Sequence, residues 1–433
     1  MLRIRFLLAL LLVSLLVSTA SAAPVFSRLG AAGQRTFAAA RATEGVVLPT
    51  DDGAVLMSVD TDAMREFRTA GGGLLTLPTA TGGTLDLELA RYDVMGPGTN
   101  VTYTDATGRH PFVPDVTLFR GHVAGDTTSW VVLSMSGAGV LGTIEQNGRR
   151  LMLTPAQGFA PEGSTSVGVH ALAPEDAASI AAVASRWECG INADNERAYG
   201  LTDLPLGLEA PRRMATPDAA QLNGTRMNFT AGVDCDLEVY STKFASNLTA
   251  ATAYVMTLLG TVNLVYERDL EATILWNYVN LWTVSDPYNA TSTSTELPEF
   301  RSYWVANNGA INVQLKHLLS GRSLGGGIAY VDAVCSNGYG VSQIDGVYTY
   351  PTTTTTWDAM VVSHEIGHNM GSPHTHSCTW QAEGRWTGTI DSCVTAEGGC
   401  ATYTNHLPPD KGTIMSYCHL VGGTAGGMRL EFH

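Results

Sequence analysis

Three histidines in the C-terminal half have the types and spacing of a metal site. The segment that starts at residue 364 reads HEIGHNMGSPH, with histidines at positions 364, 368 and 374. Residues four apart on a helix lie on one face, so the imidazoles of His364 and His368 can reach one ion. Histidine nitrogens bind Zn2+ at about 2.0–2.1 Å, and three protein ligands leave the open fourth position of a catalytic zinc site. The pattern therefore predicts one catalytic Zn2+ ion held by His364, His368 and His374.

Two further residues of this segment supply the rest of the predicted chemistry. Glu365 projects beside the metal without binding it, where its carboxylate can act as the general base toward a zinc-activated water. Gly371 can take a positive φ without a Cβ clash, so it can end the helix and turn the chain back to bring His374 to the ion. The alternative of two core histidines on a buried helix explains neither Gly371 nor His374. We therefore predict hydrolysis of peptide bonds.

A methionine-containing turn lies further along the chain. Residues 412–417 read GTIMSY, a turn that accompanies the extended histidine motif. Met415 is expected to form an apolar floor beneath the histidines without binding the metal. Tyr417 could stabilise the oxyanion of the reaction, and simple packing under the site is an equal alternative. His376 is expected around the ligands or on the surface, because a fourth histidine would close the metal to water.

Both helices and strands are predicted around these residues. Apolar residues recur at spacings of three and four over 248–265, which predicts a long helix. Residues 233–240 resemble a strand, and the glycine run 325–327 leads into another strand. A helix begins near Trp357 and carries the histidines. Strands and helices in this order predict a mixed α/β catalytic domain over 227–433.

The N-terminal half has a different pattern. Residues 23–190 are rich in Gly, Thr and Ala, with short alternating apolar runs separated by turn signals, which predicts a β-rich domain. Residues 191–226 lose this periodicity and have the composition of a linker. Arg212-Arg213 within the linker is a candidate processing site, or an ordinary exposed basic pair.

The N-terminus has the features of a secretion signal. Arg3 and Arg5 precede the apolar run Phe6–Val17, and a small-residue cleavage pattern follows at 20–22. We predict a signal peptide over residues 1–22 and an extracellular protein; an uncleaved anchor is the alternative. No later stretch is long enough to span a membrane. The net charge of -15 argues against nucleic acid and anionic membranes as partners.

The cysteine count points to an unpaired thiol. An oxidising compartment preserves disulfides, and seven cysteines leave at least one without a partner in the monomer. Cys189 stands far ahead of the others, so we expect it to be the free one. Three disulfides are expected among the remaining six, which are Cys235, Cys335, Cys378, Cys393, Cys400 and Cys418.

Taken together, the motifs resemble a reprolysin (adamalysin-type) metzincin metallopeptidase that carries its propeptide. The histidine motif and the methionine turn are typical of metzincins, and the block 248–283 resembles the reprolysin catalytic domain. Phe119–Val123 and Ser129–Val131 resemble the reprolysin propeptide. The resemblance implies a twisted, mostly parallel sheet whose antiparallel edge strand, near 326–331, pairs with the substrate backbone.

The resemblance also implies roles for cysteines. Cys335 and Cys418 are expected to form the disulfide that ties the sheet to the methionine turn. Cys189 lies just before the linker and is expected to bind the zinc as a thiolate, which would keep the precursor latent. A free or intermolecular thiol is the alternative for Cys189.

Two positions depart from the reprolysin pattern. Thr375 follows the third histidine where adamalysins usually have Asp, and Tyr417 stands where astacins and serralysins place a tyrosine. An astacin- or serralysin-like metzincin is therefore one alternative, and a non-catalytic zinc-holding adhesion module is another. We predict a secreted zinc endopeptidase that acts on protein or peptide substrates. The sequence assigns neither a calcium site nor an oligomeric state.

Overall fold

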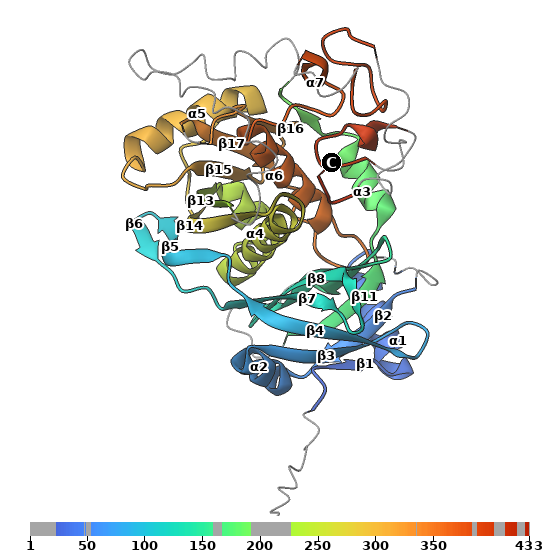
Figure 1. Cartoon of the computed structure of the whole chain (residues 1–433). Helices are drawn as coiled ribbons and strands as arrows, with labels where there is room; N and C mark the ends of the chain where they lie inside the picture. Colours follow the sequence, from blue (N-terminus) through green and yellow to red (C-terminus); the bar gives the residue numbers. More distant parts are fainter. Residues whose placement is uncertain are drawn as a thin grey trace, which may run out of the picture.

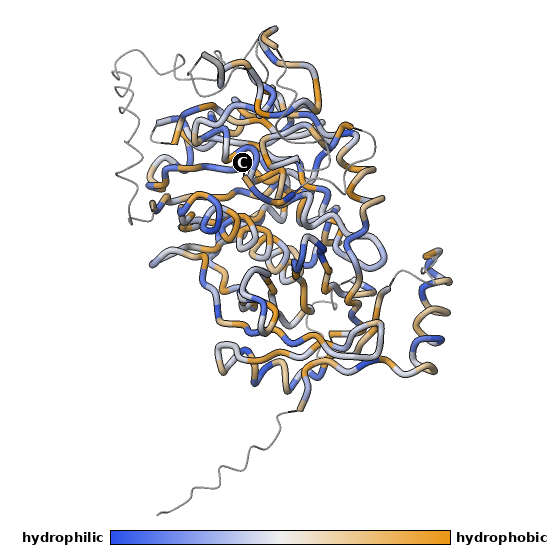
Figure 2. The backbone as a smooth tube through the Cα atoms, turned by 45° about the vertical axis from the view of Figure 1, so that its right-hand side comes forward, coloured by the Kyte–Doolittle hydropathy of each residue, from blue (hydrophilic) through white to orange (hydrophobic). Residues whose placement is uncertain are grey.

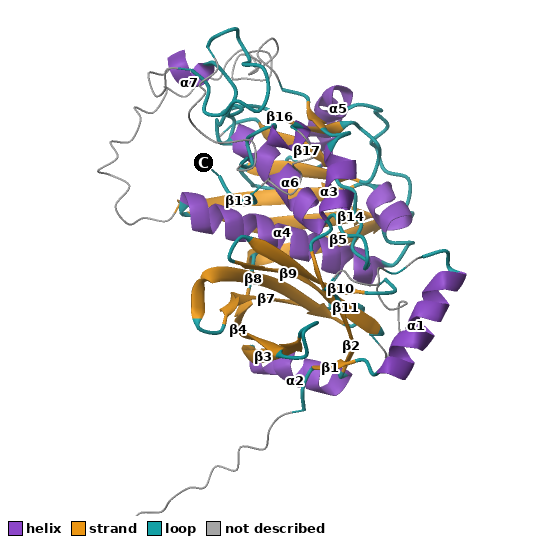
Figure 3. Cartoon of the chain, turned by 90° about the vertical axis from the view of Figure 1, so that its right-hand side faces the viewer, coloured by secondary structure: helices purple, strands orange, loops and turns teal. Residues whose placement is uncertain are grey.

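Two sheets with a long helix between them make up most of the structure (Figures 1 and 3). The computed structural model describes residues 23–46, 48, 53–158, 167–191, 227–334, 336–382, 388–401, 412–421 and 429–432. The predicted signal peptide and Arg212-Arg213 lie outside the described residues. The mixed α/β class and the β-rich N-terminal region are confirmed.

The first sheet belongs entirely to the N-terminal half. It has nine strands in the order β1-β2-β11-β10-β9-β8-β7-β4-β3, and every neighbouring pair is antiparallel. Leu87 and Leu89 are buried while Glu88 between them is exposed, as expected for a strand with one face on a core. The strands are β1 (Phe26–Arg28), β2 (Val55–Val59), β3 (Gly72–Pro78), β4 (Thr84–Tyr92), β7 (Val116–Val123), β8 (Asp126–Ser136), β9 (Gly139–Gln146), β10 (Arg149–Pro155) and β11 (Val169–Pro174).

The second sheet contains the strands of the predicted catalytic domain. Its order is β12-β16-β17-β15-β13-β14-β5-β6, and it is parallel except for the pairs β16–β17 and β5–β6. The central strands are β13 (Met227–Cys235), β14 (Ala272–Trp282), β15 (Leu315–Ser320), β16 (Gly326–Ala329) and β17 (Gly338–Gln343).

Both edges of this second sheet come from the N-terminal half. β12 (Glu188–Cys189) covers β16, so the strand expected to form the edge is paired on both sides in the described structure. At the other end, β5 (Met95–Asp105) lies parallel to β14 and forms a hairpin with β6 (Gly108–Pro111). The sequence pattern did not predict either pairing.

Helix α4 (Leu248–Leu270) confirms the long helix predicted from residue 248, and it lies between the two sheets (Figure 3). Every residue from Ala250 to Tyr266 is buried. Hydrophobic segments run through this middle region of the molecule (Figure 2). Among the described residues α4 is the one helix long and apolar enough to cross a membrane, but its burial in the core accounts for that composition. The other helices are α1 (Ala31–Thr43), α2 (Thr61–Ala70), α3 (Ala177–Ala184), α5 (Thr293–Asn307), α6 (Thr355–Asn369) and α7 (Thr379–Ala382).

The strand predicted over 233–240 is wrong in its second half. β13 ends at Cys235, and a π-helical turn follows at Val239–Lys243. The carboxylate of Asp236 accepts a hydrogen bond from the N–H of Val239 at 3.0 Å. Such a bond from a side chain to the nearby backbone competes with strand pairing and turns the chain out of the sheet.

Candidate metal centre

Helix α6 carries the first two histidines of the motif, and all fifteen of its residues are buried. Beyond the helix, Gly371 has a φ of 91°, in the region that glycine adopts without a Cβ clash. Its N–H donates to the carbonyl of His368 at 2.8 Å, so the chain reverses direction at this point. The reversal brings His374 back alongside the helix.

The three predicted ligands converge on one point. The Nε2 atom of His368 lies 3.2 Å from the Nε2 atoms of both His364 and His374. Two nitrogens bound to one tetrahedral Zn2+ at 2.0–2.1 Å are about 3.3 Å apart. The residues therefore fit a zinc ion.

Backbone carbonyls hold the rings of the two helical histidines. The Nδ1–H of His364 donates to the carbonyl of Ile414 at 2.7 Å, and that of His368 donates to the carbonyl of Ser372 at 2.8 Å. These bonds leave each Nε2 with a free lone pair, as a metal ligand requires. Burial lowers the pKa of His364 well below its usual value and that of His368 to about 3, so both rings are neutral.

A carboxylate holds the third histidine. Glu397 accepts from Nδ1 of His374 at 3.1 Å and lies 3.2 Å from Nε2 of His376. Although burial opposes its ionisation, hydrogen bonds from both histidines lower the pKa of Glu397. Burial lowers the pKa of His374 to about 4. Glu397 was not predicted, because it lies on a loop with no recognisable spacing from the motif.

Glu365 lies beside the converging histidines and is fully buried. Its Oε1 has no hydrogen-bond partner among the described residues, and burial raises the pKa of its carboxyl well above the usual value. The side chain lies directly against Gly327 of β16, where a Cβ would collide with the carboxylate. The glycine at position 327 therefore leaves room for the predicted general base.

Cys189 approaches the same point from strand β12. Its Sγ lies 3.4 Å from Nε2 of His368 and 3.8 Å from Oε2 of Glu365. Sulfur and nitrogen ligands on one zinc ion, at about 2.3 Å and 2.0–2.1 Å, would be about 3.5 Å apart. The ligand atoms of Cys189 and of the three histidines all lie within 4.8 Å of one another. Burial and then the nearby Glu365 raise the pKa of the Cys189 thiol.

Backbone hydrogen bonds fix β12 on β16. The N–H of Glu188 donates to the carbonyl of Gly325 at 2.9 Å, and the N–H of Gly190 donates to the carbonyl of Gly327 at 2.8 Å. Gly326 between them has a φ of 152°, and a Cβ there would collide with the carbonyl of Glu188. Gly326 thus permits the close approach of β12, as Gly327 permits that of Glu365.

Two aromatic residues complete the contact between β12 and the metal centre. The hydroxyl of Tyr417 accepts from the N–H of Cys189 at 3.0 Å, so it contacts the strand that carries the thiol. The indole of Trp187 is buried, with its ring centroid 5.1 Å from that of His364 and 5.4 Å from that of His419. The sequence had assigned no role to Trp187.

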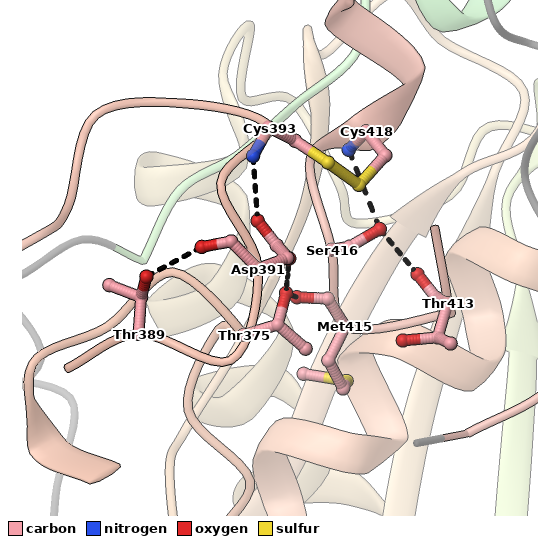
Figure 4. The surroundings of a disulfide bond; sticks show 8 residues. All are labelled: Thr375, Thr389, Asp391, Cys393, Thr413, Met415, Ser416 and Cys418. Atoms are coloured by element: carbon pink, nitrogen blue, oxygen red, sulfur yellow. Dashed lines mark hydrogen bonds between the residues drawn. A yellow bond between two sulfur atoms is a disulfide. The ribbon is translucent and has the colours of Figure 1, made fainter. Parts of the chain in front are cut away.

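The methionine turn lies under the helix. Met415 is buried, and a Cβ on Gly367 of α6 would come 2.6 Å from its Sδ. The N–H of Thr375 donates to the carbonyl of Met415 at 3.0 Å, and its hydroxyl bonds to the carboxylate of Asp391 (Figure 4). Thr375 occupies the position where adamalysins usually have Asp, so Asp391 supplies a carboxylate to this position from another loop.

The predicted Cys335–Cys418 disulfide is wrong. Cys418 is bonded to Cys393 (Figure 4), and a second disulfide joins Cys378 to Cys400. The Asp391 carboxylate accepts from the N–H of Cys393 at 3.0 Å, and its bond to Thr375 holds this loop beside the methionine turn.

The free thiols differ in part from the prediction. Cys189 is free, as expected, but Cys235 is also a buried free thiol instead of a member of a disulfide. Cys335 lies outside the described residues.

Comparison with known proteins identifies the second half of the chain. Residues 225–424 match the profile of Metallo-peptidase family M12, of the reprolysin type. The chain contains a reprolysin domain of metallopeptidase family M12. It is 30% identical over 139 residues to a snake venom metalloproteinase, fibrolase, from Macrovipera lebetinus. That match covers 31% of this chain and 66% of the relative, so the chain spans just under two thirds of its length.

A solved structure also matches a large part of this chain. Metalloproteinase-II from Bacteroides fragilis is 12% identical and aligns with 72% of this chain and 85% of its own, with a TM-score of 0.36.

Proposed function

We propose that the chain is a secreted zinc endopeptidase of the metzincin class, made as a latent precursor. The observation that carries this proposal is that Nε2 of His368 lies 3.2 Å from Nε2 of both His364 and His374, as in a tetrahedral zinc site, beside the buried carboxyl of Glu365. The M12 match supports the same chemistry. The two disulfides, together with the venom relative, support an extracellular location.

Each part of the chain has a proposed task. Residues 1–22 act as the signal peptide and 23–190 as the propeptide. Residues 191–226 form the linker that is cut, and 227–433 form the catalytic domain.

The chain's own residues perform the proton transfers. His364, His368 and His374 would hold the ion, which when bound supplies Lewis acidity and lowers the pKa of water to roughly 7. Glu365 takes the proton of the attacking water and passes it to the leaving amine. Met415 supports the histidines from below. Tyr417, released from Cys189, is available to donate a hydrogen bond to the oxyanion.

Strand β12 would keep the precursor latent because it occupies both the substrate-pairing edge of β16 and the open position of the metal site. Its hydrogen bonds use the backbone of β16 that an extended substrate would pair with. The Cys189 sulfur lies where the fourth ligand of the ion would be, and thiolate in that position excludes water.

The proposal is tested by hydrolysis of an unfolded protein after removal of residues 23–226. The wild-type domain should cleave it, and a chelator should stop the reaction. Glu365→Gln should keep one zinc per chain while losing on the order of 10²–10⁴-fold in rate, because general-base catalysis is removed. A zinc-loaded wild-type domain that cleaves nothing would contradict the proposal and favour the non-catalytic adhesion module.

A further inference from the structure

The N-terminal half contacts the M12 domain at three separate places, and two of them are remote from the metal centre. The first is the far edge of the second sheet, where β5 pairs with β14 from Val101 to Thr104. The hydroxyls of Thr102 and Thr104 both donate to Oδ1 of Asn280, at 2.8 and 2.9 Å. Here the N-terminal half completes a sheet that the M12 domain leaves open.

The second place is the face of α4 that turns away from its own sheet. Thr257 donates to the hydroxyl of Ser134 at 2.6 Å, and the Asn263 side chain donates to the hydroxyl of Tyr92 at 2.7 Å. Arg120 forms an ion pair with Glu267. Strands β7, β8 and β9 of the first sheet thus cover a helix of the M12 domain (Figures 1 and 3).

Packing on this face is close and shares one core. A Cβ on Gly260 would lie 3.2 Å from a methyl group of Leu118, so a larger side chain at 260 would push the first sheet away. Buried residues of the N-terminal half join the same apolar cluster as α4; they include Tyr92, Val94, Val101, Leu118, Trp130, Val132 and Leu141. Separating the halves would expose this apolar surface to water, which is unfavourable.

The third place is β12 at the metal centre, described above. The three contacts belong to one folded unit, so release of any one leaves the other two to hold it at high effective concentration. The residues named for these three contacts lie before residue 191 or after residue 226.

We propose that cutting the chain within residues 191–226 does not release the N-terminal half, which remains bound to the M12 domain as a second chain. The interaction surface is the outer face of α4 together with the free edge of β14, and its partner is the first sheet with its β5–β6 hairpin. Latency after the cut rests on the proposed function; the association does not. Activation then requires a second event that unfolds or degrades the N-terminal chain.

The test uses the full chain with a site-specific protease sequence placed within 191–226 and a tag at the C-terminus. After complete cleavage, both fragments should co-elute on size exclusion in native buffer and separate only in denaturant. Elution of the M12 fragment without the N-terminal fragment would overturn the inference.

Variants localise the interaction. Arg120→Glu places like charges opposite each other at Glu267, and Gly260→Leu inserts a wedge while favouring the helix. Each should lower the affinity of the cut fragments at least tenfold. Arg91→Glu makes the same charge change at an exposed position of the first sheet and should leave the fragments associated. Arg120→Glu fragments that stay associated as tightly as wild type would also overturn the inference.

The two proposals fail in different ways. If the cut fragments separate and the M12 domain is active, the proposal of a retained complex is wrong and the endopeptidase proposal stands. If the cut fragments co-elute, but the M12 domain stays inactive once the N-terminal chain is afterwards removed, the endopeptidase proposal alone is contradicted. Co-elution can also be measured with Glu365→Gln, so the association is read without catalysis.

Discussion

The two edges of the second sheet are both covered by the N-terminal half, but by different means. At one edge β12 contributes two residues, and its specific contacts are those of Cys189, Trp187 and the backbone beside the metal ligands. At the other edge the β5–β6 hairpin pairs with β14 over a longer stretch, and the adjoining sheet packs on α4. A short contact with metal-binding chemistry can control access to the site, whereas the longer contact supplies attachment. Changes at the first edge should therefore alter activity, and changes at the second should alter stability.

The largest expected effect is at the metal-side edge. Cys189→Ser should raise the activity of the intact precursor at least about 100-fold, equivalent to roughly 2.7 kcal/mol, because the thiolate ligand is lost. The rate of hydrolysis of an unfolded protein by uncut precursor measures this. Cys235→Ser, at the other free thiol, is the control and should stay latent. If the Cys189→Ser precursor were as inactive as wild type, the thiol at this edge would not be what controls activity.

Next in size is the support of the third ligand. Glu397→Gln should weaken zinc binding by about 10–100-fold, because loss of a carboxylate bonded to a ligating histidine lowers metal affinity by that amount. Competition with a chromogenic chelator measures the affinity of the domain freed of residues 23–226. Glu271→Gln, at an exposed position, is the control. Unchanged affinity in Glu397→Gln would show that His374 needs no such support.

At the far edge, replacing Thr102 and Thr104 together by Val should lower the free energy of unfolding by about 2 kcal/mol, because two hydrogen bonds to Asn280 are lost. Latency should not change. Denaturant titration of the precursor measures stability, and an activity assay on the same sample measures latency. Thr84→Val, at an exposed position of β4, should alter neither. Activation of the double variant without loss of stability would reverse the assignment of the two edges.

The smallest expected effect lies in the first sheet, remote from both edges. His170 is buried and accepts from the N–H of Val140 at 2.9 Å, and burial lowers its pKa to about 4. The unfolded chain binds a proton at His170 near pH 6.5 and the folded chain does not, so its contribution to stability is lost as the pH falls from 6.5 toward 4.

Between pH 6 and pH 5 this loss is about 1 kcal/mol. Denaturant titrations at the two pH values should show a smaller decrease in His170→Gln, which retains an acceptor for Val140. His122→Gln, on the partly exposed face of β7, should follow wild type. An equal decrease in all three proteins would show that the first sheet does not carry this acid sensitivity.

Local patterns predicted those parts of the molecule that depend on neighbouring residues. The spacing of His364 and His368 follows from helix geometry, and Gly371 is close enough to them for its turn to be anticipated. The apolar periodicity of α4 predicted a helix with extensive burial. Its burial on both sides was not anticipated, because periodicity does not say what covers the second face.

Long-range pairings left no such signal. Residues 101–104 pair with β14 across a large sequence separation, and nothing in their own pattern distinguishes them from strands of the first sheet. Glu397 and Asp391 reach the metal centre from a loop held by disulfides whose partners the sequence did not identify. Family resemblance predicted Cys418 as a disulfide cysteine but assigned it the wrong partner, because the bond depends on how this chain folds its own loop.

We propose that three histidine nitrogens and the Cys189 sulfur surround one zinc ion in the precursor. Zinc X-ray absorption on the intact, metal-loaded chain tests it most directly. We expect one zinc per chain with three nitrogen ligands at about 2.0–2.1 Å and one sulfur ligand at about 2.3 Å, and loss of the sulfur ligand in Cys189→Ser. A wild-type spectrum without sulfur, or a chain that binds no zinc, would contradict it.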